Sequence, residues 1–304
     1  MATIVLVHGI AQEQSSAADL EDEWLPSLAG GLENAKFGSL ADRLRAGDFD
    51  ARMAFYGDIF LTADHQGLEP DQLTADEQLI AEELALDLLR SAAESENQSD
   101  AGEARLELEI LTAEADDAQG ALKTMAVSAA GVLDHIPWFG RGALAAGSAV
   151  NRTLAQVTRY LNEPAIHDHA IAQVNHHLRP ETRVVIGHSL GSVVAYDTLR
   201  ARPSNQPVPL LVTLGSPLGL SAISKRLKPQ PPAFPAAVRR WVNIAAPDDV
   251  VAARRDLHPV FDRDRPHGAV FEKTWRVENG SKPHQVNFYL TKKSCGSAVA
   301  DALR

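Results

Sequence analysis

Ser189 lies in a short glycine-containing turn between two regular patterns. It is the middle residue of Gly-His-Ser-Leu-Gly, which runs from Gly187 to Gly191. The apolar run at 183–186 is typical of a buried strand, and residues 190–201 have the spacing of a helix. A strand-to-helix turn of this kind lifts a serine hydroxyl clear of the sheet, where it can act as a nucleophile. Both glycines are expected to be needed because neighbouring backbone crowds the turn.

Two backbone amides are candidates to stabilise the negative charge that attack by such a serine creates. The N–H of Leu190, at the start of the predicted helix, points to where an oxyanion would develop. A second apolar run ends in His8-Gly9-Ile10. There the backbone can turn toward the nucleophile, and the N–H of Ile10 is the second candidate donor.

These residues resemble the α/β-hydrolase fold family, and its lipase/esterase-like branch in particular. The matching segments are Val-Leu-Val-His-Gly at 5–9, Gly-His-Ser-Leu-Gly-Ser with the Val-Val-Ala-Tyr-Asp after it, Leu-Val-Thr-Leu-Gly-Ser-Pro-Leu at 211–218, the stretch 241–252, and Pro283-His284 with Tyr289-Leu290. They lie in residues 2–10 and 165–303, about half of the chain. The resemblance implies a Ser-acid-His triad in the chain order Ser, Asp, His.

The same resemblance implies an acid in the loop after the strand predicted over 240–245. Asp248 and Asp249 both lie in that loop. The family pattern Asp-Pro-Val-Ala maps onto Asp249, with Val250 in place of the usual proline, and Asp248 stays as the reserve acid. A turn-forming role is the structural alternative for either aspartate.

The resemblance also implies a base beyond the acid, where three histidines remain. His284 follows the last predicted strand, 273–277, where the family carries its base, and is assigned that role on this resemblance. His258 and His267 lie in a Pro- and Arg-rich stretch and are expected to be solvated. His188 is next to the nucleophile in sequence, but the turn directs its side chain away, so we expect it to pack nearby.

The resulting expectation is a serine hydrolase that cleaves carboxylic esters, with acyl lipids as one candidate substrate, through an acyl-enzyme. Thioesterases, amidases and peptidases use the same triad. The rival from another class is a non-enzymatic interaction protein on a hydrolase scaffold, with the acidic helical segment 64–117 as its docking surface. The presence of Ser189, His284 and the aspartates argues against this rival.

The elements that must position these residues form an alternating pattern. Short apolar runs predict strands at 3–7, 51–56, 183–186, 210–214, 240–245 and 273–277. Helical patterns at 164–178 and 190–201 lie between them. Alternation of this kind predicts an α/β fold, with a mostly parallel central sheet flanked by helices.

A large helical insertion is predicted at 58–160, so that 1–57 and 161–304 form the α/β core. Residues 77–93 and 105–118 have helical spacing, and the polar stretch 91–102 is predicted to be a loop. Residues 121–150 are apolar, with Trp138 and Phe139 at the centre. They suit either a lid over an acyl-binding cleft or ordinary helical packing.

The charge is concentrated in one part of the insertion. The chain has a net charge of −11, and residues 64–117 hold 17 Asp/Glu against Arg90 and Arg105. That segment carries a net charge of −15, and the rest of the chain is slightly basic. A solvated helical face explains the acidic stretch more simply than a partner surface does. An acidic balance also argues against a nucleic-acid partner.

The remaining sequence features concern metals and other cofactors, the redox compartment and the location of the protein. Four histidines, His167, His169, His176 and His177, lack the i, i+4 pairing of a metal site, so neither a metal nor another cofactor is expected. The single cysteine, Cys295, fits a reducing compartment. We expect a cytoplasmic protein with neither a signal peptide nor a membrane span. The sequence leaves its oligomeric state open.

Overall fold

A parallel sheet forms the centre of the molecule. The computed structural model describes residues 2–61, 73–96, 98–114, 147–252 and 256–304. The strands lie in the order β2-β1-β3-β4-β5-β6, β7 also pairs with β5, and all of these pairings are parallel. Their bounds are β1 Ile4–Val7, β2 Ala51–Ala54, β3 Val184–His188, β4 Val208–Leu214, β5 Val238–Ala245, β6 Val270–Phe271 and β7 Trp275–Arg276. The predicted α/β fold with a mostly parallel sheet is confirmed.

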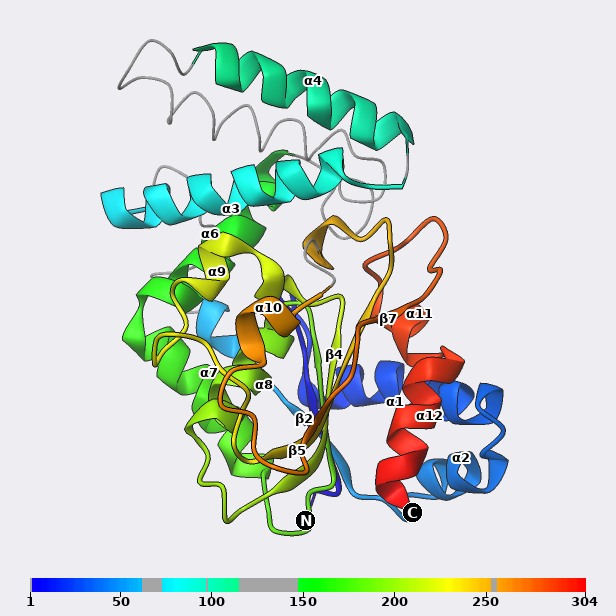
Figure 1. Cartoon of the computed structure of the whole chain (residues 1–304). Helices are drawn as coiled ribbons and strands as arrows, with labels where there is room; N and C mark the ends of the chain where they lie inside the picture. Colours follow the sequence, from blue (N-terminus) through cyan, green and yellow to red (C-terminus); the bar gives the residue numbers. More distant parts are fainter. Residues whose placement is uncertain (1, 62–72, 97, 115–146, 253–255) are drawn as a thin grey trace.

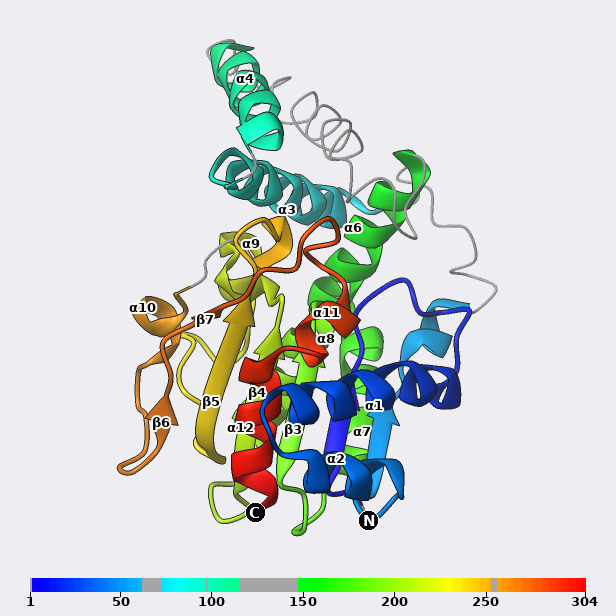
Figure 2. The same cartoon turned by 90° about the vertical axis from the view of Figure 1, so that its right-hand side faces the viewer.

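Helices cover both faces of this sheet (Figure 1). Along β1, Ile4 and Leu6 point into one apolar core, and Val5 and Val7 point into the other. Because successive side chains of a strand alternate between faces, every position of β1 is buried. Figure 2 shows one set of helices in front of the sheet: α1 Ala17–Asn34, α2 Gly38–Arg45, α11 Val286–Leu290 and α12 Lys293–Leu303. The other face is covered by α7 Pro164–His177 and α8 Leu190–Ala201.

Helix α1 has no counterpart among the predicted elements. It begins with a capping box, in which Ser16 Oγ accepts from the Asp19 N–H and the Asp19 carboxylate accepts from the Ser16 N–H. The buried residues Leu20, Trp24 and Leu28 then follow at four-residue spacing. This spacing and the cap are the sequence signals for the helix.

A second group of helices lies over the end of the sheet where the strands finish. It contains α3 Ala75–Ala93, α4 Gln98–Glu114 and α6 Gly147–Asn162. Helix α3 packs on α4 and α6, and also on α9 Ser221–Ser224 and η4 Val250–Ala252. Because α9 follows β4 and η4 follows β5, α3 covers the carboxyl ends of those strands. The other short helices in the described part of the chain are η1 Gly57–Leu61, η3 Pro217–Gly219 and α10 His258–Phe261.

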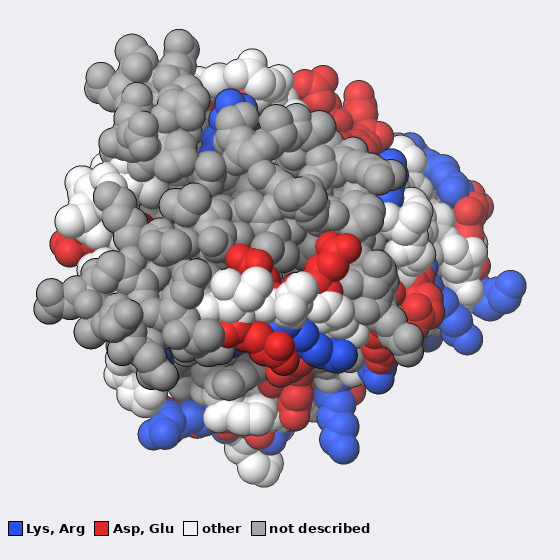
Figure 3. All heavy atoms as spheres, turned by 90° about the horizontal axis from the view of Figure 1, so that it is seen from above, with Lys and Arg blue, Asp and Glu red and all other residues white. Residues whose placement is uncertain are grey.

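Ion pairs join the acidic helices to the core. Arg226 pairs with Glu83 of α3 at 2.7 Å, and Arg276 pairs with Glu96 just beyond that helix. From above, red carboxylate and blue basic side chains adjoin one another at several places (Figure 3). Part of the acidic charge is therefore matched by the slightly basic core.

The helical insertion is confirmed over its described part. The predicted loop at 91–102 is too long, because α3 continues to Ala93 and α4 begins at Gln98. Helix α6 runs two residues past the predicted boundary at 160. Most of the predicted lid, 121–146, lies outside the described residues, and so do Trp138 and Phe139. Among the described helices, none is both long and apolar enough to cross a bilayer.

Candidate functional site

Ser189 occupies a strained turn between β3 and α8. Its backbone has φ 52° and ψ −132°, a combination that L-residues seldom adopt. A Cβ on Gly187 would lie 2.5 Å from the carbonyl oxygen of Gly191, and one on Gly191 would lie 2.2 Å from that of Val7. Both glycines are therefore required by close backbone approach, as the sequence predicts. The N–H of Ser189 donates to the carbonyl of Leu214 at 3.1 Å and fixes the turn on β4.

The end of β1 lies directly against this turn. A Cβ on Gly9 would be 2.9 Å from the Ser189 Cβ and 3.4 Å from its Oγ. The carbonyl of Gly9 accepts from His8 Nδ1 at 2.6 Å, and the Tyr56 hydroxyl donates to the His8 carbonyl at 2.6 Å. Because a trans peptide is planar, the N–H of Ile10 points away from the tethered carbonyl of Gly9. Among the described residues, neither this N–H nor that of Leu190 has a hydrogen-bond acceptor.

His8 is held in one tautomer inside the protein. Its Nε2 accepts the N–H of Tyr56 at 3.1 Å, so the proton of the neutral ring is on Nδ1. The ring stacks on Tyr56 at 4.2 Å between centroids. Burial lowers the pKa of His8 to about 4, so the ring is neutral at pH 7.

His284 and Asp249 form a pair. Asp249 lies in the loop after β5, and His284 lies in the loop between β7 and α11. His284 Nδ1 lies 2.9 Å from each carboxylate oxygen of Asp249. The carboxylate is fully buried, whereas 24% of the His284 side chain is exposed. Gly215, with φ 52°, lies beneath the pair, since a Cβ there would be 2.7 Å from Asp249 Oδ2. With Nδ1 directed at Asp249, Nε2 is the imidazole nitrogen left for a reacting group.

Two further donors hold the Asp249 carboxylate. The Tyr289 hydroxyl donates to Oδ2 at 2.6 Å, and the N–H of Val251 donates to Oδ1 at 3.1 Å. The same Tyr289 oxygen accepts the N–H of Ala246 at 2.9 Å. Burial, together with the adjacent Asp249, raises the pKa of Tyr289 well above its ordinary value, so the hydroxyl keeps its proton and can donate.

The alternatives named from the sequence lie apart from this pair. Asp248 is half-buried and accepts from Ser95 Oγ at 3.4 Å, beside the end of α3. His258 lies against Asp256 at 2.9 Å and stacks on Phe271. His267 is exposed. Of the two candidate acids and three candidate bases, the structure brings together Asp249 and His284.

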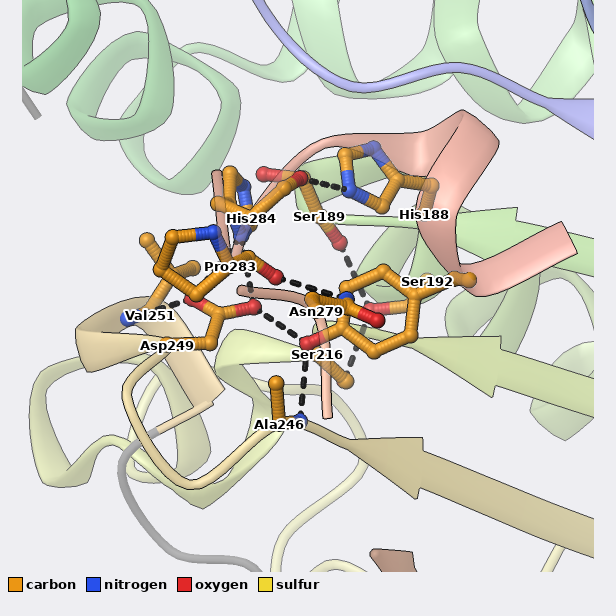
Figure 4. A network of polar contacts seen from close by, with 11 residues as sticks. His188, Ser189, Ser192, Ser216, Ala246, Asp249, Val251, Asn279, Pro283 and His284 are labelled. Atoms are coloured by element: carbon orange, nitrogen blue, oxygen red, sulfur yellow. Dashed lines mark hydrogen bonds and ion pairs between the residues drawn. The ribbon is translucent and has the colours of Figure 1, made fainter. Parts of the chain in front are cut away.

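His188 links the serine turn to the loop that carries His284. Its Nε2 donates to the backbone carbonyl of His284 at 2.8 Å, and the two rings are 4.7 Å apart between centroids. Burial, followed by the nearby His284, lowers the pKa of His188 to about 3, so the ring is neutral. Figure 4 shows this contact together with the His284–Asp249 pair. His188 therefore packs beside the site, as expected, and also fixes the backbone of His284.

The serine and the imidazole share this network without a direct bond. No hydrogen bond joins Ser189 to the His284 ring among the described residues. In proteins without bound substrate, such contacts are often long and shorten when the reactants bind. Ser192 Oγ donates to the Ser189 carbonyl at 2.6 Å, and Asn279 Nδ2 donates to the Pro283 carbonyl at 2.8 Å. Each segment is thus also held by a hydrogen bond of its own (Figure 4).

Sequence reasoning missed the parts played by Tyr289, Tyr56 and His8. Each acts through a contact that joins segments far apart in the chain, such as Tyr289 with Asp249. The signal for Tyr289 was its place five residues after His284, where its polar group must find a buried partner. Nothing in the local sequence points to the contact of Tyr56 with His8.

The described residues contain no group of three or more His, Cys, Asp or Glu placed to hold a metal ion. Comparison with family models, with curated proteins and with solved structures finds no match to this chain.

Proposed function

We propose that the protein is a serine hydrolase that cleaves carboxylic esters. The observation that carries this proposal is the His284–Asp249 pair, with Nδ1 2.9 Å from the carboxylate, whose loop is joined through His188 to the strained strand-to-helix turn of Ser189. A pair of this kind orients an imidazole as a general base for an adjacent nucleophile. The lipase/esterase-like branch of the α/β-hydrolase fold is the family that we propose for it.

The sheet topology supports a reaction site at this place. In doubly wound sheets ordered 2-1-3-4-5, ligands bind beyond the carboxyl ends of the strands, where the strand order reverses between β1 and β3. Gly9 follows β1 and Ser189 follows β3, and the two are in contact. The candidate nucleophile therefore lies at the position where this topology favours a ligand.

The proposed mechanism assigns each group one task. His284 Nε2 takes the proton of Ser189 Oγ as this oxygen attacks the ester carbonyl carbon. The negative charge then forms on the carbonyl oxygen, where the N–H groups of Ile10 and Leu190 stabilise it; each such donor is worth roughly 3 kcal/mol. His284 returns the proton to the leaving alcohol, and Asp249 stabilises the imidazolium. Water, activated by the same imidazole, hydrolyses the acyl-enzyme and releases the acid.

A series of p-nitrophenyl esters of increasing acyl length tests the proposal. We expect release of p-nitrophenolate by the wild type and none by Ser189→Ala, with kcat/KM highest at the acyl length that the cleft accommodates. A preference for long chains would support acyl lipids as substrates. Equal rates for the wild type and Ser189→Ala, or no turnover by folded protein across the whole series, would contradict the proposal.

A further inference from the structure

The turn that carries the Ile10 amide is tied to the helical insertion. Ala11 has φ 58°, the left-handed region that costs a non-glycine residue about 1 kcal/mol. Its N–H donates to Gln156 Oε1 on α6 at 2.9 Å, across 145 positions of sequence. The Gln156 side chain is the sole described acceptor for this N–H. A side-chain amide from the insertion therefore holds the turn in an unfavourable conformation.

The Gln156 side chain forms a hydrogen bond at each end of its amide group. It is 2% exposed, and its Nε2 donates to Glu13 Oε2 at 3.2 Å. Its amide group thus contacts two residues on the same side of the Ile10 turn. Loss of the Oε1 acceptor would leave the Ala11 N–H without its partner, and the turn would lose the contact that offsets its strain.

The peptide that carries the Ile10 N–H lies between two fixed points. On one side, the carbonyl of Gly9 is bonded to His8, as described above. On the other side, the N–H of Ala11 is bonded to Gln156. The direction of the Ile10 N–H is therefore set from the sheet and from α6 together.

The same face of α6 also contacts the helix that carries Leu190. Tyr160 lies one turn after Gln156, and its hydroxyl donates to Asp197 Oδ2 of α8 at 2.8 Å. Residues four apart on a helix share a face. One face of α6 thus holds the Ile10 turn through Gln156 and α8 through Tyr160.

We propose that Gln156 is a positioning residue that aims the oxyanion-stabilising N–H of Ile10, so that the helical insertion completes the active site. This inference rests on the proposed function, because it gives that N–H its task. Since α6 also packs on α3, a change in the packing of the insertion would change the direction of the Ile10 N–H toward the reacting carbonyl. A lid that merely admits substrate would alter KM instead.

The test compares three variants in hydrolysis of one short p-nitrophenyl ester. Gln156→Met removes the acceptor at similar length. Gln156→Glu keeps an acceptor for Ala11 but places a carboxylate beside Glu13. Gln156→Glu combined with Glu13→Gln keeps the acceptor for the Ala11 N–H and restores the bond between the two side chains with donor and acceptor exchanged. Arg152→Ala, at an exposed position of the same helix, is the matched control.

We expect kcat to fall about tenfold to a hundredfold in Gln156→Met, with little change in KM, as for other small displacements of reacting groups. Gln156→Glu should be impaired at neutral pH, the exchanged pair should recover most of the kcat, and Arg152→Ala should match the wild type. A trifluoromethyl ketone, whose adduct with the serine places an oxyanion at the same amides, should bind more weakly in proportion to kcat. Melting temperatures show which variants are folded.

The possible outcomes separate the two proposals. If wild-type protein hydrolyses the ester but folded Gln156→Met retains kcat within twofold, the role of Gln156 is wrong and the serine hydrolase stands. If Gln156→Met does not fold, the comparison of Gln156→Glu with the exchanged pair decides, and equal kcat values would overturn the inference. An inert wild type would overturn the function and the inference together.

Discussion

His284 Nδ1 lies 2.9 Å from both carboxylate oxygens of Asp249, so that one buried carboxylate fixes the orientation of one partly exposed imidazole. Tyr289 and Val251 hold the carboxylate from its other sides. His188 holds the backbone of His284 through its carbonyl. The imidazole is therefore oriented through both its ring and its backbone, which is the support that a general base needs.

Replacing each of the two adjacent aspartates separates their roles. Asp249→Asn should lower kcat roughly 10⁴-fold, the size of loss seen when a triad acid becomes an amide that favours the wrong imidazole tautomer. Asp248→Asn should leave kcat within about twofold, because Asp248 contacts Ser95 and not His284. The measurement is steady-state hydrolysis of one p-nitrophenyl ester by both variants. A greater loss in Asp248→Asn would show that the observed pair is not the functional one.

Tyr289→Phe should weaken both stability and turnover. The substitution leaves the buried N–H of Ala246 without its acceptor, which costs roughly 1–3 kcal/mol of unfolding free energy. It also removes one donor from Asp249. If loss of that donor raises the activation free energy by about 1.4 kcal/mol, kcat falls about tenfold.

Tyr196→Phe is the matched control for this substitution. The buried hydroxyl of Tyr196 likewise accepts a backbone N–H, that of Ala233, but it donates to the carbonyl of Ala233 and has no contact with the Asp249 pair. Denaturant unfolding should show similar stability losses for both variants, whereas kcat should fall only in Tyr289→Phe. Equal kcat values in the two variants would refute a positioning role for Tyr289.

Acid should destabilise the fold through its buried neutral histidines. The folded-state pKa of His188 is about 3, below the ordinary 6.5, so the unfolded chain binds the proton first as the pH falls. Stability is therefore lost from about pH 6.5 downward until the folded pKa is reached. Between pH 7 and 5 this histidine accounts for about 2 kcal/mol. His8, whose pKa is about 4, acts in the same direction.

His188→Gln tests this dependence, since its amide can still donate to the His284 carbonyl. Denaturant unfolding at a series of pH values should show that the variant loses about 2 kcal/mol less than the wild type between pH 7 and 5. Identical pH profiles would mean that His188 is not held neutral in the folded protein.

The parallel core was predictable because its strands are buried on both faces. The runs around β3, β4 and β5 are mostly apolar, and the predicted ends of each strand lie within about two residues of the observed ones. Strand β6 was missed because two residues, Val270 and Phe271, carry no periodicity. Helix α1 was missed although its cap and its buried Trp24 offered a signal.

The residues of the candidate site were easier to predict from the sequence than the contacts that join them. The strand-turn-helix pattern pointed to Ser189, and the family resemblance pointed to His284 and Asp249. Sequence alone left Asp248 open, because adjacent residues of a loop can point either way. The contacts made by His8, Tyr289 and Gln156 join distant segments, so their partners emerge only from the folded chain.

The nucleophilic character of Ser189 is the central claim, and a fluorophosphonate probe tests it most directly. The serine oxygen attacks phosphorus and fluoride leaves, so one adduct per chain remains for mapping by peptide mass spectrometry. We predict complete labelling of the folded protein on the peptide that contains Ser189, no labelling of Ser189→Ala, and no labelling of denatured wild type. An unlabelled folded wild type, or an adduct on another residue that persists in Ser189→Ala, would contradict the account.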